Sequence, residues 1–540
     1  MSLSTLEKWL HLIQTNLENE QFDQARSHLE NALSAFPNDA QLWTLFGITA
    51  LKQSELYLAE HTLLHALSLS TSTKTLYYLG MVYEQQNKWP EASHIYHHLL
   101  KIDPDFYVAS FALGHIYQVQ QQFDAAEKAY LHVITRCPQH VSAYYNLALL
   151  YQENHHYKQA FNCYEQVIFI EPNHFIARWN YASLLFARGY YKKAAKHYSE
   201  ALQLNNQESD LALNYASVLY LLGRFDEIIT VLLPFLQREP EHSELNYSVA
   251  LAYYHLGQFD QAIPLLEKTI TLNPQRVEAY SNLNDIYAQL QQTERARQYG
   301  IQALSLKDAL FSQKVTPLST TIPRPLDLEK KKKVISFSLW GEIPTYTLGA
   351  IENARLISKI YPDWIGRFYC DQSVPEHILT ALATSGAEVI LMPPAQHYEG
   401  LFWRFQVASD PDVGYFLCRD CDSRLNLREK AAVDAWIISG KAFHIMRDEL
   451  IHSELILAGM WGGVAGILPH LAQEITQFIQ THPPHRWMDQ VFLREYIWGQ
   501  VKTHCLIHDS YFAPLFDAVP FPESVRTLPA VGQGFKMLST

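Results

Sequence analysis

Cysteine is scarce in this chain, and basic residues are outnumbered by acidic ones. Six cysteines are spread over 540 residues, too few and too scattered for a disulfide framework, so we expect a reducing compartment. Lys and Arg number 42 against 55 Asp and Glu, which gives a formal net charge of −13. Nucleic-acid binding requires a basic surface, so no nucleic-acid partner is expected.

Long apolar runs are also missing. No stretch reaches the roughly 18 apolar residues of a membrane span, and the first residues lack the order of a secretory signal. We therefore expect no transmembrane segment and a cytoplasmic location. The sequence has no Gly-rich phosphate loop ending in Lys-Ser or Lys-Thr, and "GMWGG" lacks a nucleophilic serine, which argues against a P-loop enzyme and a serine hydrolase.

A repeat of about 34 residues fills the first part of the chain. Small residues recur in register at Ala25, Ala59, Ala92, Ala126, Ala160, Ala194, Ala262 and Ala296, with Ile228 in the one gap. Prolines close many of the units, at Pro104, Pro138, Pro172, Pro240 and Pro274. Because proline ends or begins a helix, the pattern predicts about nine helix pairs over residues 1–306.

These units resemble the tetratricopeptide repeat, as in "AYYNLALLYQENHHYKQAFNCYEQVIFIEPN" (143–173). The resemblance implies an all-α superhelix that binds other molecules, although such scaffolds have many different ligands.

Asparagines form a second ladder on the expected first helix of several units. They stand at Asn146, Asn180, Asn214 and Asn282, at intervals of 34 or 68 residues. Amides offer both donors and acceptors, so a ladder of them could bind the backbone of a protein acceptor in a groove. A similar ladder is a feature of the repeat domain of O-GlcNAc transferase, which also joins a solenoid to a glycosyltransferase. Helix packing is the alternative role for these residues.

The repeat pattern stops at a proline- and lysine-rich segment, "KVTPLSTTIPRPLDLEKKKK" (314–333). We expect a linker at 307–333 and independent folding of the parts on either side. Beyond it, apolar strands are predicted at 334–341, 366–371, 387–393 and 413–420, with helices at 349–362 and 375–386. Alternating strands and helices predict an α/β domain over 334–540 with a mainly parallel sheet, whose ligands bind at the carboxyl ends of the strands.

Two aspartates end the fourth expected strand, in "RDCDSR". Asp420 and Asp422 are two residues apart, so in an extended chain both carboxylates point the same way. Hard oxygen ligands suit Mn²⁺ or Mg²⁺, and such an ion can neutralise the charge of a diphosphate. Cys418 and Cys421 overlap the motif, but no second pair of cysteines completes a zinc site.

The second domain resembles GT-A-type glycosyltransferases, the nucleotide-diphospho-sugar transferase fold with its D-x-D motif, and especially a bacterial group of such domains. The resemblance covers about 334–515 and rests on "SLWG", "FWRF", "RDCDSR", "HIMRD", "LAGMWGG", "MDQVFL" and "IHDSYF". It implies that Asp420 and Asp422 bind the metal and that His508 completes its shell, with His504 as a rival. It implies a catalytic or sugar-holding role for Asp489. The residues implied to bind the donor are Trp340, Gly341, Arg404, Arg419, Arg447, His452, Gly462 and Gly463.

The sequence thus predicts a metal-dependent, hexosyltransferase-like enzyme. It would move a sugar from a UDP- or GDP-sugar to a protein or glycan acceptor that the repeats select. The alternative is a non-catalytic interaction scaffold whose second domain keeps the transferase-like fold without the activity.

Overall fold

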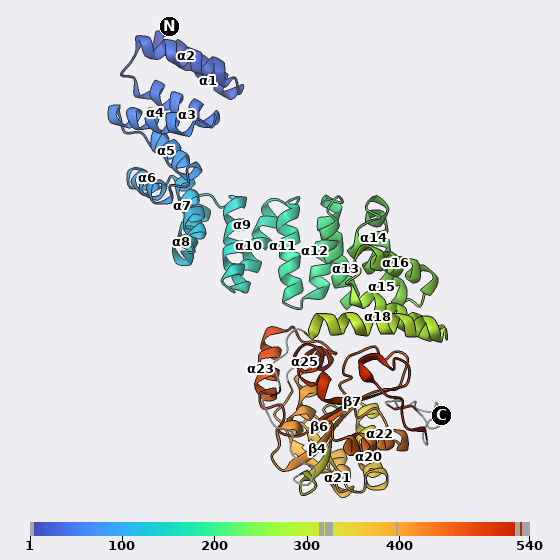
Figure 1. Ribbon diagram of the computed structural model, residues 1–540. Helices are drawn as coiled ribbons and strands as arrows, with labels where there is room; N and C mark the ends of the chain where they lie inside the picture. The colour runs from blue at the N-terminus through green and yellow to red at the C-terminus, as the bar shows by residue number, and fades with distance from the viewer. Residues whose placement is uncertain (1–4, 313–317, 319–327, 396–397, 524–529, 532–540) are drawn as a thin grey trace. The chain divides into compact units, whose positions relative to one another are not determined.

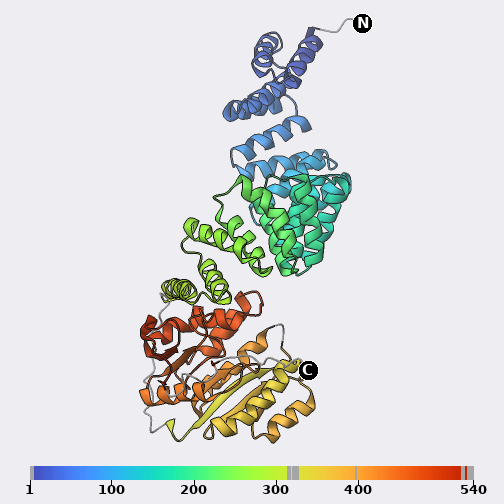
Figure 2. The ribbon, with the colours of Figure 1, turned by 90° about the vertical axis from the view of Figure 1, so that its right-hand side faces the viewer.

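The chain forms two compact units, Met1–Arg224 and Phe225–Thr540. The computed structural model describes residues 5–312, 318, 328–395, 398–523 and 530–531. Within these ranges, no helix is both long and apolar enough to cross a bilayer. Figures 1 and 2 show the helical repeats and, after them, a region of mixed sheet and helices.

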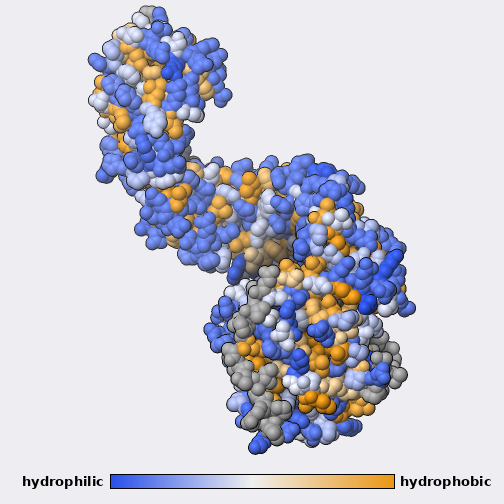
Figure 3. All heavy atoms as spheres, in the orientation of Figure 1, coloured by the Kyte–Doolittle hydropathy of each residue, from blue (hydrophilic) through white to orange (hydrophobic). Residues whose placement is uncertain are grey.

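The described part of the first unit consists of six helix pairs followed by α13, drawn from blue to green in Figure 1. Their bounds are α1 Thr5–Glu18, α2 Phe22–Ala35, α3 Ala40–Lys52, α4 Leu56–Leu69, α5 Thr73–Gln85, α6 Trp89–Ile102, α7 Tyr107–Val119, α8 Phe123–Arg136, α9 Val141–Glu153, α10 Tyr157–Ile170, α11 Phe175–Ala187, α12 Tyr191–Leu204 and α13 Ser209–Leu221. The face shown in Figure 3 is mostly hydrophilic over this unit, with scattered hydrophobic residues.

The small residues of the repeat lie where two helices approach closely. A Cβ added at Gly80 would overlap the ring of Tyr96, and one at Gly114 would overlap the ring of Tyr130. The alanines of the ladder, such as Ala160, are fully buried. The periodic small positions therefore let an aromatic ring of one helix fill the space beside its partner.

The second unit begins with further repeat helices. These are α14 Phe225–Arg238, α15 Ser243–His255, α16 Phe259–Leu272, α17 Val277–Gln289 and the longer α18 Thr293–Phe311. Counted over the described residues 5–312, the two units contain 18 repeat helices, which is the number that nine two-helix repeats require.

A seven-stranded sheet follows the repeats. Its strands are β1 Lys332–Leu339, β2 Ile365–Cys370, β3 Glu388–Leu391, β4 Val413–Arg419, β5 Phe443–Arg447, β6 Trp461–Val464 and β7 Cys505–Asp509. The order across the sheet is β3-β2-β1-β4-β6-β5-β7. Only β6 is reversed, because it runs antiparallel to both β4 and β5, while the other pairs are parallel. The sheet is thus mainly parallel, as predicted, with one reversed strand that was not foreseen.

Helices cover both faces of this sheet. On one face, α20 (Pro344–Ile360) packs on β1 and β2, and α22 (Leu427–Ser439) packs on β5 and β7. On the other, the 3₁₀ helix η1 (Glu399–Ser409) crosses β1 and β4. Alternation along β1 directs Ser336 to η1, where its hydroxyl donates to the carbonyl of Arg404, while the next residue, Phe337, stacks on Phe368. Short helices complete the region: α21 Glu376–Thr384, α23 Leu471–Thr481, α24 Met488–Phe492, the π-helix η2 Leu493–Ile497, α25 Trp498–Val501, η3 Lys502–His504 and η4 Leu515–Asp517.

The connections that follow β1 and β4 run in opposite directions along the sheet, because β1 leads to β2 and β4 leads to β5. Strand β2 lies on one side of β1, and β4 lies on the other. Parallel neighbours whose following connections diverge leave a crevice at their carboxyl ends, which is the usual ligand site of an open α/β sheet. Here that crevice lies after Leu339 and Arg419.

The last repeat helices pack directly against the sheet region (Figure 1). Leu304 of α18 belongs to the hydrophobic core around the sheet, and Gly300 lies against the ring of Phe512. The Asp308 carboxylate accepts hydrogen bonds from Trp498 Nε1 at 2.8 Å and from Lys502 Nζ at 3.0 Å. The predicted boundaries at 306 and 334 stay predictions, and much of the expected linker lies outside the described residues. These contacts between α18 and the sheet region were not expected from the sequence.

Candidate functional site

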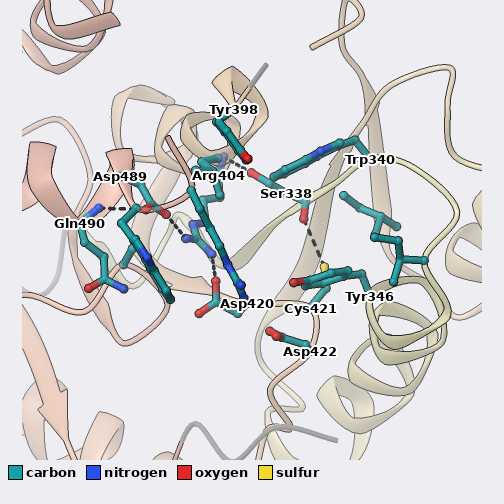
Figure 4. A pocket seen from close by; sticks show the side chains of 16 residues that line it. Ser338, Trp340, Tyr346, Tyr398, Arg404, Asp420, Cys421, Asp422, Asp489 and Gln490 are labelled. Atoms are coloured by element: carbon teal, nitrogen blue, oxygen red, sulfur yellow. Dashed lines mark hydrogen bonds and ion pairs between the residues drawn. The ribbon is translucent and has the colours of Figure 1, made fainter. Parts of the chain in front are cut away.

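A pocket of about 380 Å³ opens at the carboxyl ends of β1 and β4. Ser338, Leu339 and Trp340 contribute from the end of β1, and Asp420, Cys421 and Asp422 contribute from the residues after β4. Figure 4 shows these side chains together with those of η1 and of the segment before α24. The remaining lining residues are Ile343, Tyr346, Tyr398, Leu401, Arg404, Ala458, Arg486, Trp487, Asp489 and Gln490.

Arg404 links the two acidic sides of this pocket. Its guanidinium donates to Asp420 Oδ1 through Nη1 and to Asp489 Oδ2, at 2.6 Å, through Nη2. The same Nη1 also donates to the carbonyl of Arg419 at 3.1 Å. The side chains of Arg404 and Asp489 are only 4% and 5% exposed, whereas that of Asp420 is 43% exposed. Burial alone would lower the pKa of Arg404, but the carboxylates of Asp420 and Asp489 raise it, so the guanidinium stays charged.

The carboxyl groups of the pocket are not equivalent. Burial raises the pKa of Asp489, because the partial relief from Arg404 does not offset the loss of solvent and the nearby charge of Asp420. Burial, followed by the charge of Asp420, also raises the pKa of Asp422. Each of these two groups is therefore less readily ionised than an exposed aspartate, and a cation placed beside them would favour the charged form.

Gly459 determines how closely the chain can approach Asp420. A Cβ at this position would overlap the Asp420 carboxylate. The loop between β5 and β6, residues 448–460, thus ends against the side chain that the sequence assigned to the metal, and Ala458 of the same loop lines the pocket. Any larger residue at position 459 would displace Asp420.

Aromatic rings form the other walls of the pocket. Trp340 packs on the backbone of Gly400 and makes an edge-to-face contact with Trp403, at a centroid distance of 6.0 Å. Tyr346, Tyr398 and Trp487 complete this lining. Flat apolar rings beside charged groups suit a ligand that has both a ring face and an anionic part.

Arg486 is an exposed cation of the pocket that the sequence analysis did not single out. Its guanidinium lies 5.0 Å from the centroid of the Trp487 ring, and among the described residues it has no carboxylate partner within ion-pair distance. Arg486, Tyr346, Tyr398 and Trp487 escaped notice because they lie in loops or near helix ends. The one available signal was "RWMDQ", which places Arg486 and Trp487 immediately before the predicted Asp489.

Five of the predicted site residues therefore meet in one pocket: Trp340, Arg404, Asp420, Asp422 and Asp489. The others lie elsewhere. Gly341 follows Trp340 at a φ of +74°, where glycine is favoured, and its N–H donates to Ser373 Oγ at 2.7 Å, outside the pocket lining.

The two predicted donor-binding glycines lie inside the sheet. Gly462 and Gly463 belong to β6 and are buried between β4 and β5. A Cβ at Gly462 would overlap the carbonyl oxygen of Phe416, and one at Gly463 would lie 2.6 Å from the ring of Phe443. They were expected to bind the donor, but their small size instead permits the close packing of β6 between β4 and β5.

Three predicted donor-binding side chains also make buried structural contacts rather than lining the pocket. Arg419 Nε donates to Glu429 at 2.8 Å, and Arg447 Nε donates to Asp509 at 2.6 Å, with both pairs almost fully buried. His452 Nδ1 accepts the backbone N–H groups of Asp448 and Glu449, at 3.2 and 3.1 Å, and so closes a turn of the β5–β6 loop.

His508 does not join the two aspartates. It lies on β7, where its Nδ1 shares a hydrogen bond of 2.9 Å with His444 Nε2 and its ring packs against Phe521. Its rival His504 lies in η3 and does not line the pocket either. Across the described residues, no group of three or more His, Cys, Asp or Glu side chains is arranged to hold a metal ion. The predicted grouping of His508 with Asp420 and Asp422 is therefore not present among the described residues, and metal binding by the two aspartates stays a prediction.

The asparagine ladder is half-buried, and most of its amides already have a protein partner. Asn180 Nδ2 donates to the hydroxyl of Tyr145 at 2.9 Å, and Asn282 Nδ2 donates to that of Tyr247 at 3.4 Å. Asn146 Nδ2 lies 3.4 Å from the hydroxyl of Tyr130. Asn214 has the same half-buried setting. Packing between helices thus accounts for part of the ladder, and the groove role stays a prediction.

Comparisons with known proteins support the repeats. Tetratricopeptide repeat family models match residues 6–49, 74–105, 108–140, 145–209, 213–275 and 253–299. Tetratricopeptide repeats thus occupy roughly the first 300 residues, and they form a protein-interaction scaffold. No curated protein matches the chain significantly.

Solved structures with similar repeats include YrrB, described as a TPR protein with an unusual peptide-binding site. It is 18% identical, with a TM-score of 0.32, over 35% of this chain and 100% of that one. The C-terminal part of a TPR protein from Cytophaga hutchinsonii is 14% identical, with a TM-score of 0.36, over 50% and 98%. The pilF protein of Pseudomonas aeruginosa is 19% identical, with a TM-score of 0.33, over 38% and 94%.

Proposed function

We propose that the α/β region is a GT-A-type glycosyltransferase that uses Mn²⁺ or Mg²⁺ to move a hexose from a UDP- or GDP-sugar to an acceptor bound by the repeats. The observation that supports this most is the pocket at the carboxyl ends of β1 and β4. It gathers paired aspartates, two arginines and several aromatic rings where an open α/β sheet usually binds its ligand. The acceptor would be a protein or a glycan, and the enzyme would act in the cytoplasm.

The donor atoms suit a metal ion only if the nucleotide supplies part of its shell. Asp420 and Asp422 offer carboxylate oxygens, which Mn²⁺ and Mg²⁺ prefer. Burial, followed by the charge of Asp420, raises the pKa of Asp422, so a bound cation would stabilise its charged form. Two protein ligands are too few for an octahedral ion, so phosphate oxygens and water must complete it. A bound ion would supply charge neutralisation of the departing diphosphate.

The chain's own residues would bind and orient the donor. Trp340 offers a ring face for the base. The exposed Arg486, which has no carboxylate within ion-pair distance in the described part of the chain, would attract the phosphates. Arg404, which was expected to bind the donor, instead holds Asp420 and Asp489 in position. Asp489 faces the pocket with a raised pKa, which suits a group that must accept a proton from an acceptor hydroxyl. It would alternatively hold the sugar.

The pairing of Arg404 favours a second candidate function. Because this guanidinium already neutralises Asp420 and Asp489, the carboxylates would also be retained in a domain that only stabilises the scaffold. Such a domain would carry no transfer activity, and the protein would act through its repeats alone.

Calorimetric titration of the full chain with UDP and with GDP, each with Mn²⁺ and with EDTA, tests these alternatives. We expect Mn²⁺ and nucleotide to bind cooperatively, and Asp420→Asn to weaken binding in Mn²⁺ far more than in EDTA. Asp412→Asn is the matched control, because it removes the same charge from an exposed residue just before β4, at the opposite end of the strand. Equal binding by wild type and Asp420→Asn, with and without metal, would leave the scaffold as the remaining function.

A further inference from the structure

The loop between β5 and β6 connects the last repeat to the pocket. It begins after Arg447, the final residue of β5, and ends at Met460, before β6. Its far end touches the pocket, where Ala458 contributes to the lining and Gly459 lies against the Asp420 carboxylate. The position of this loop therefore limits the space that is open to the Asp420 carboxylate, whose other contact is with Arg404.

Helix α17 holds the beginning of the loop. Asn284 is fully buried, and its Nδ2 donates to the carbonyl of Leu450 and to that of Ala296, each at 2.9 Å. The side chain of Leu450 packs into the hydrophobic cluster of the last repeats, which includes Leu283 and Ala296. A residue of the α/β region thus packs against the core of the last repeats.

Helix α18 holds the middle of the loop. The ammonium group of Lys307, on a side chain only 4% exposed, donates to the carbonyl of Ser453 and to Glu454 Oε1, both at 2.6 Å. A buried lysine requires such partners, because an unpaired charge in this setting would be costly. Arg447 Nη1 fixes the next residue by donating to the carbonyl of Leu455 at 3.2 Å.

We infer that Lys307 and Asn284 are positioning residues of the pocket, so that the last repeat, α17–α18, is part of the machinery that binds the nucleotide and metal. They act through the β5–β6 loop, which they hold so that Gly459 supports Asp420. The inference rests on the proposed nucleotide-diphosphate site. It goes beyond that proposal because it gives the repeat array a part in binding the nucleotide, whereas the proposed function gives the repeats only the binding of the acceptor.

The proposed linkage is reciprocal by thermodynamic necessity. If the repeat helices favour the loop position that binds nucleotide, then nucleotide binding must favour the contacts of those helices with the loop. UDP with Mn²⁺ should therefore slow amide hydrogen exchange in the loop and in the part of α18 around Lys307.

The test compares variants of neighbouring residues on α18 in the full chain. Lys307→Met removes the bonds to the loop, whereas Lys307→Arg keeps a cation there. Asp308→Asn is the matched control. Asp308 lies on the same helix and also faces the sheet region, but it contacts Trp498 and Lys502 instead of the loop. The readouts are UDP affinity in Mn²⁺, measured by calorimetry well below each variant's Tm, and the Tm itself.

We expect Lys307→Met to lower UDP affinity about tenfold, within the usual range of coupling between sites, while Lys307→Arg recovers most of it. Asp308→Asn should lower the Tm and leave UDP affinity unchanged. Wild-type affinity in Lys307→Met would overturn the inference and leave the proposed site intact, as would equal losses in Lys307→Met and Asp308→Asn. If the wild-type chain bound neither UDP nor GDP, the proposed function would be refuted, and the positioning role would fall with it.

Discussion

Replacing Arg404 with methionine should strongly destabilise the sheet region. Methionine keeps much of the side-chain volume but removes the cation between Asp420 and Asp489. The Asp489 side chain is 5% exposed, so it would be left as a buried, uncompensated charge. Removing one partner of a buried ion pair costs about 3–5 kcal/mol. The pair with Asp420, whose side chain is 43% exposed, adds less than about 1 kcal/mol.

Guanidinium-induced unfolding of the full chain, followed by tryptophan fluorescence, measures this loss. Seven of the 11 tryptophans report mainly on the sheet region: Trp340, Trp364, Trp403, Trp436, Trp461, Trp487 and Trp498. A loss of about 4 kcal/mol is a large share of the stability of a typical domain, about 5–15 kcal/mol. The fluorescence transition should therefore move to a clearly lower denaturant concentration.

Two further variants separate the buried charge from general damage. Adding Asp489→Asn to Arg404→Met removes the unpaired carboxylate and should restore part of the lost stability. Lys430→Met breaks a partly exposed ion pair with Asp434 on α22, so it should cost less than about 1 kcal/mol. If Arg404→Met unfolds at the same denaturant concentration as Lys430→Met, the reasoning about a buried charge pair is refuted.

Three other predictions concern the loop, the histidines and the asparagine ladder. Gly459→Ala should displace Asp420 and weaken UDP binding in Mn²⁺ about tenfold, roughly 1.4 kcal/mol, in calorimetry; unchanged affinity would contradict the contact between them. Burial lowers the pKa of His452 and His508 to about 4, below the ordinary value of about 6.5, so both imidazoles are neutral at pH 7. Their contribution to stability is fully present above about pH 6.5 and is lost as the pH falls toward 4, by up to about 3 kcal/mol each, and a double replacement by Gln should flatten this dependence of the unfolding midpoint. Asn180→Ala removes the hydrogen bond to Tyr145 and should cost the repeats about 0.5–1.5 kcal/mol in thermal unfolding; an unchanged Tm would return Asn180 to a groove role.

The repeat helices could be predicted because their signal is local and repeated. The same contact recurs from unit to unit, such as Gly80 against Tyr96 and Gly114 against Tyr130. A unit with an unusual residue can therefore still be recognised from its neighbours. The early strands were also found, since β1 and β4 are apolar runs followed by polar residues. Their carboxyl ends placed Trp340 and Asp420 in one pocket, because parallel neighbours end at the same edge of a sheet.

The remaining site residues depend on contacts that no local pattern contains. Gly462, Gly463 and Arg447 were expected to bind the donor, but β6 turns back between β4 and β5 and takes the glycines into the sheet. A reversed strand of four residues has no distinct sequence signature. His508 could not be separated from the aspartates without knowing that β7 is the edge strand beyond β5.

The contact of α17 and α18 with the sheet region has a consequence for how such a protein can change in length. A repeat array needs a cap at its ends, since an uncovered terminal helix exposes apolar surface. At its C-terminal end the α/β region serves as that cap, through Leu450, Phe512 and the neighbours of Lys307. Repeats ahead of α14 can therefore be gained or lost without changing the surface that supports the pocket. Loss of the last pair would uncover the apolar face of the remaining array and remove the contacts that hold the loop beside Asp420.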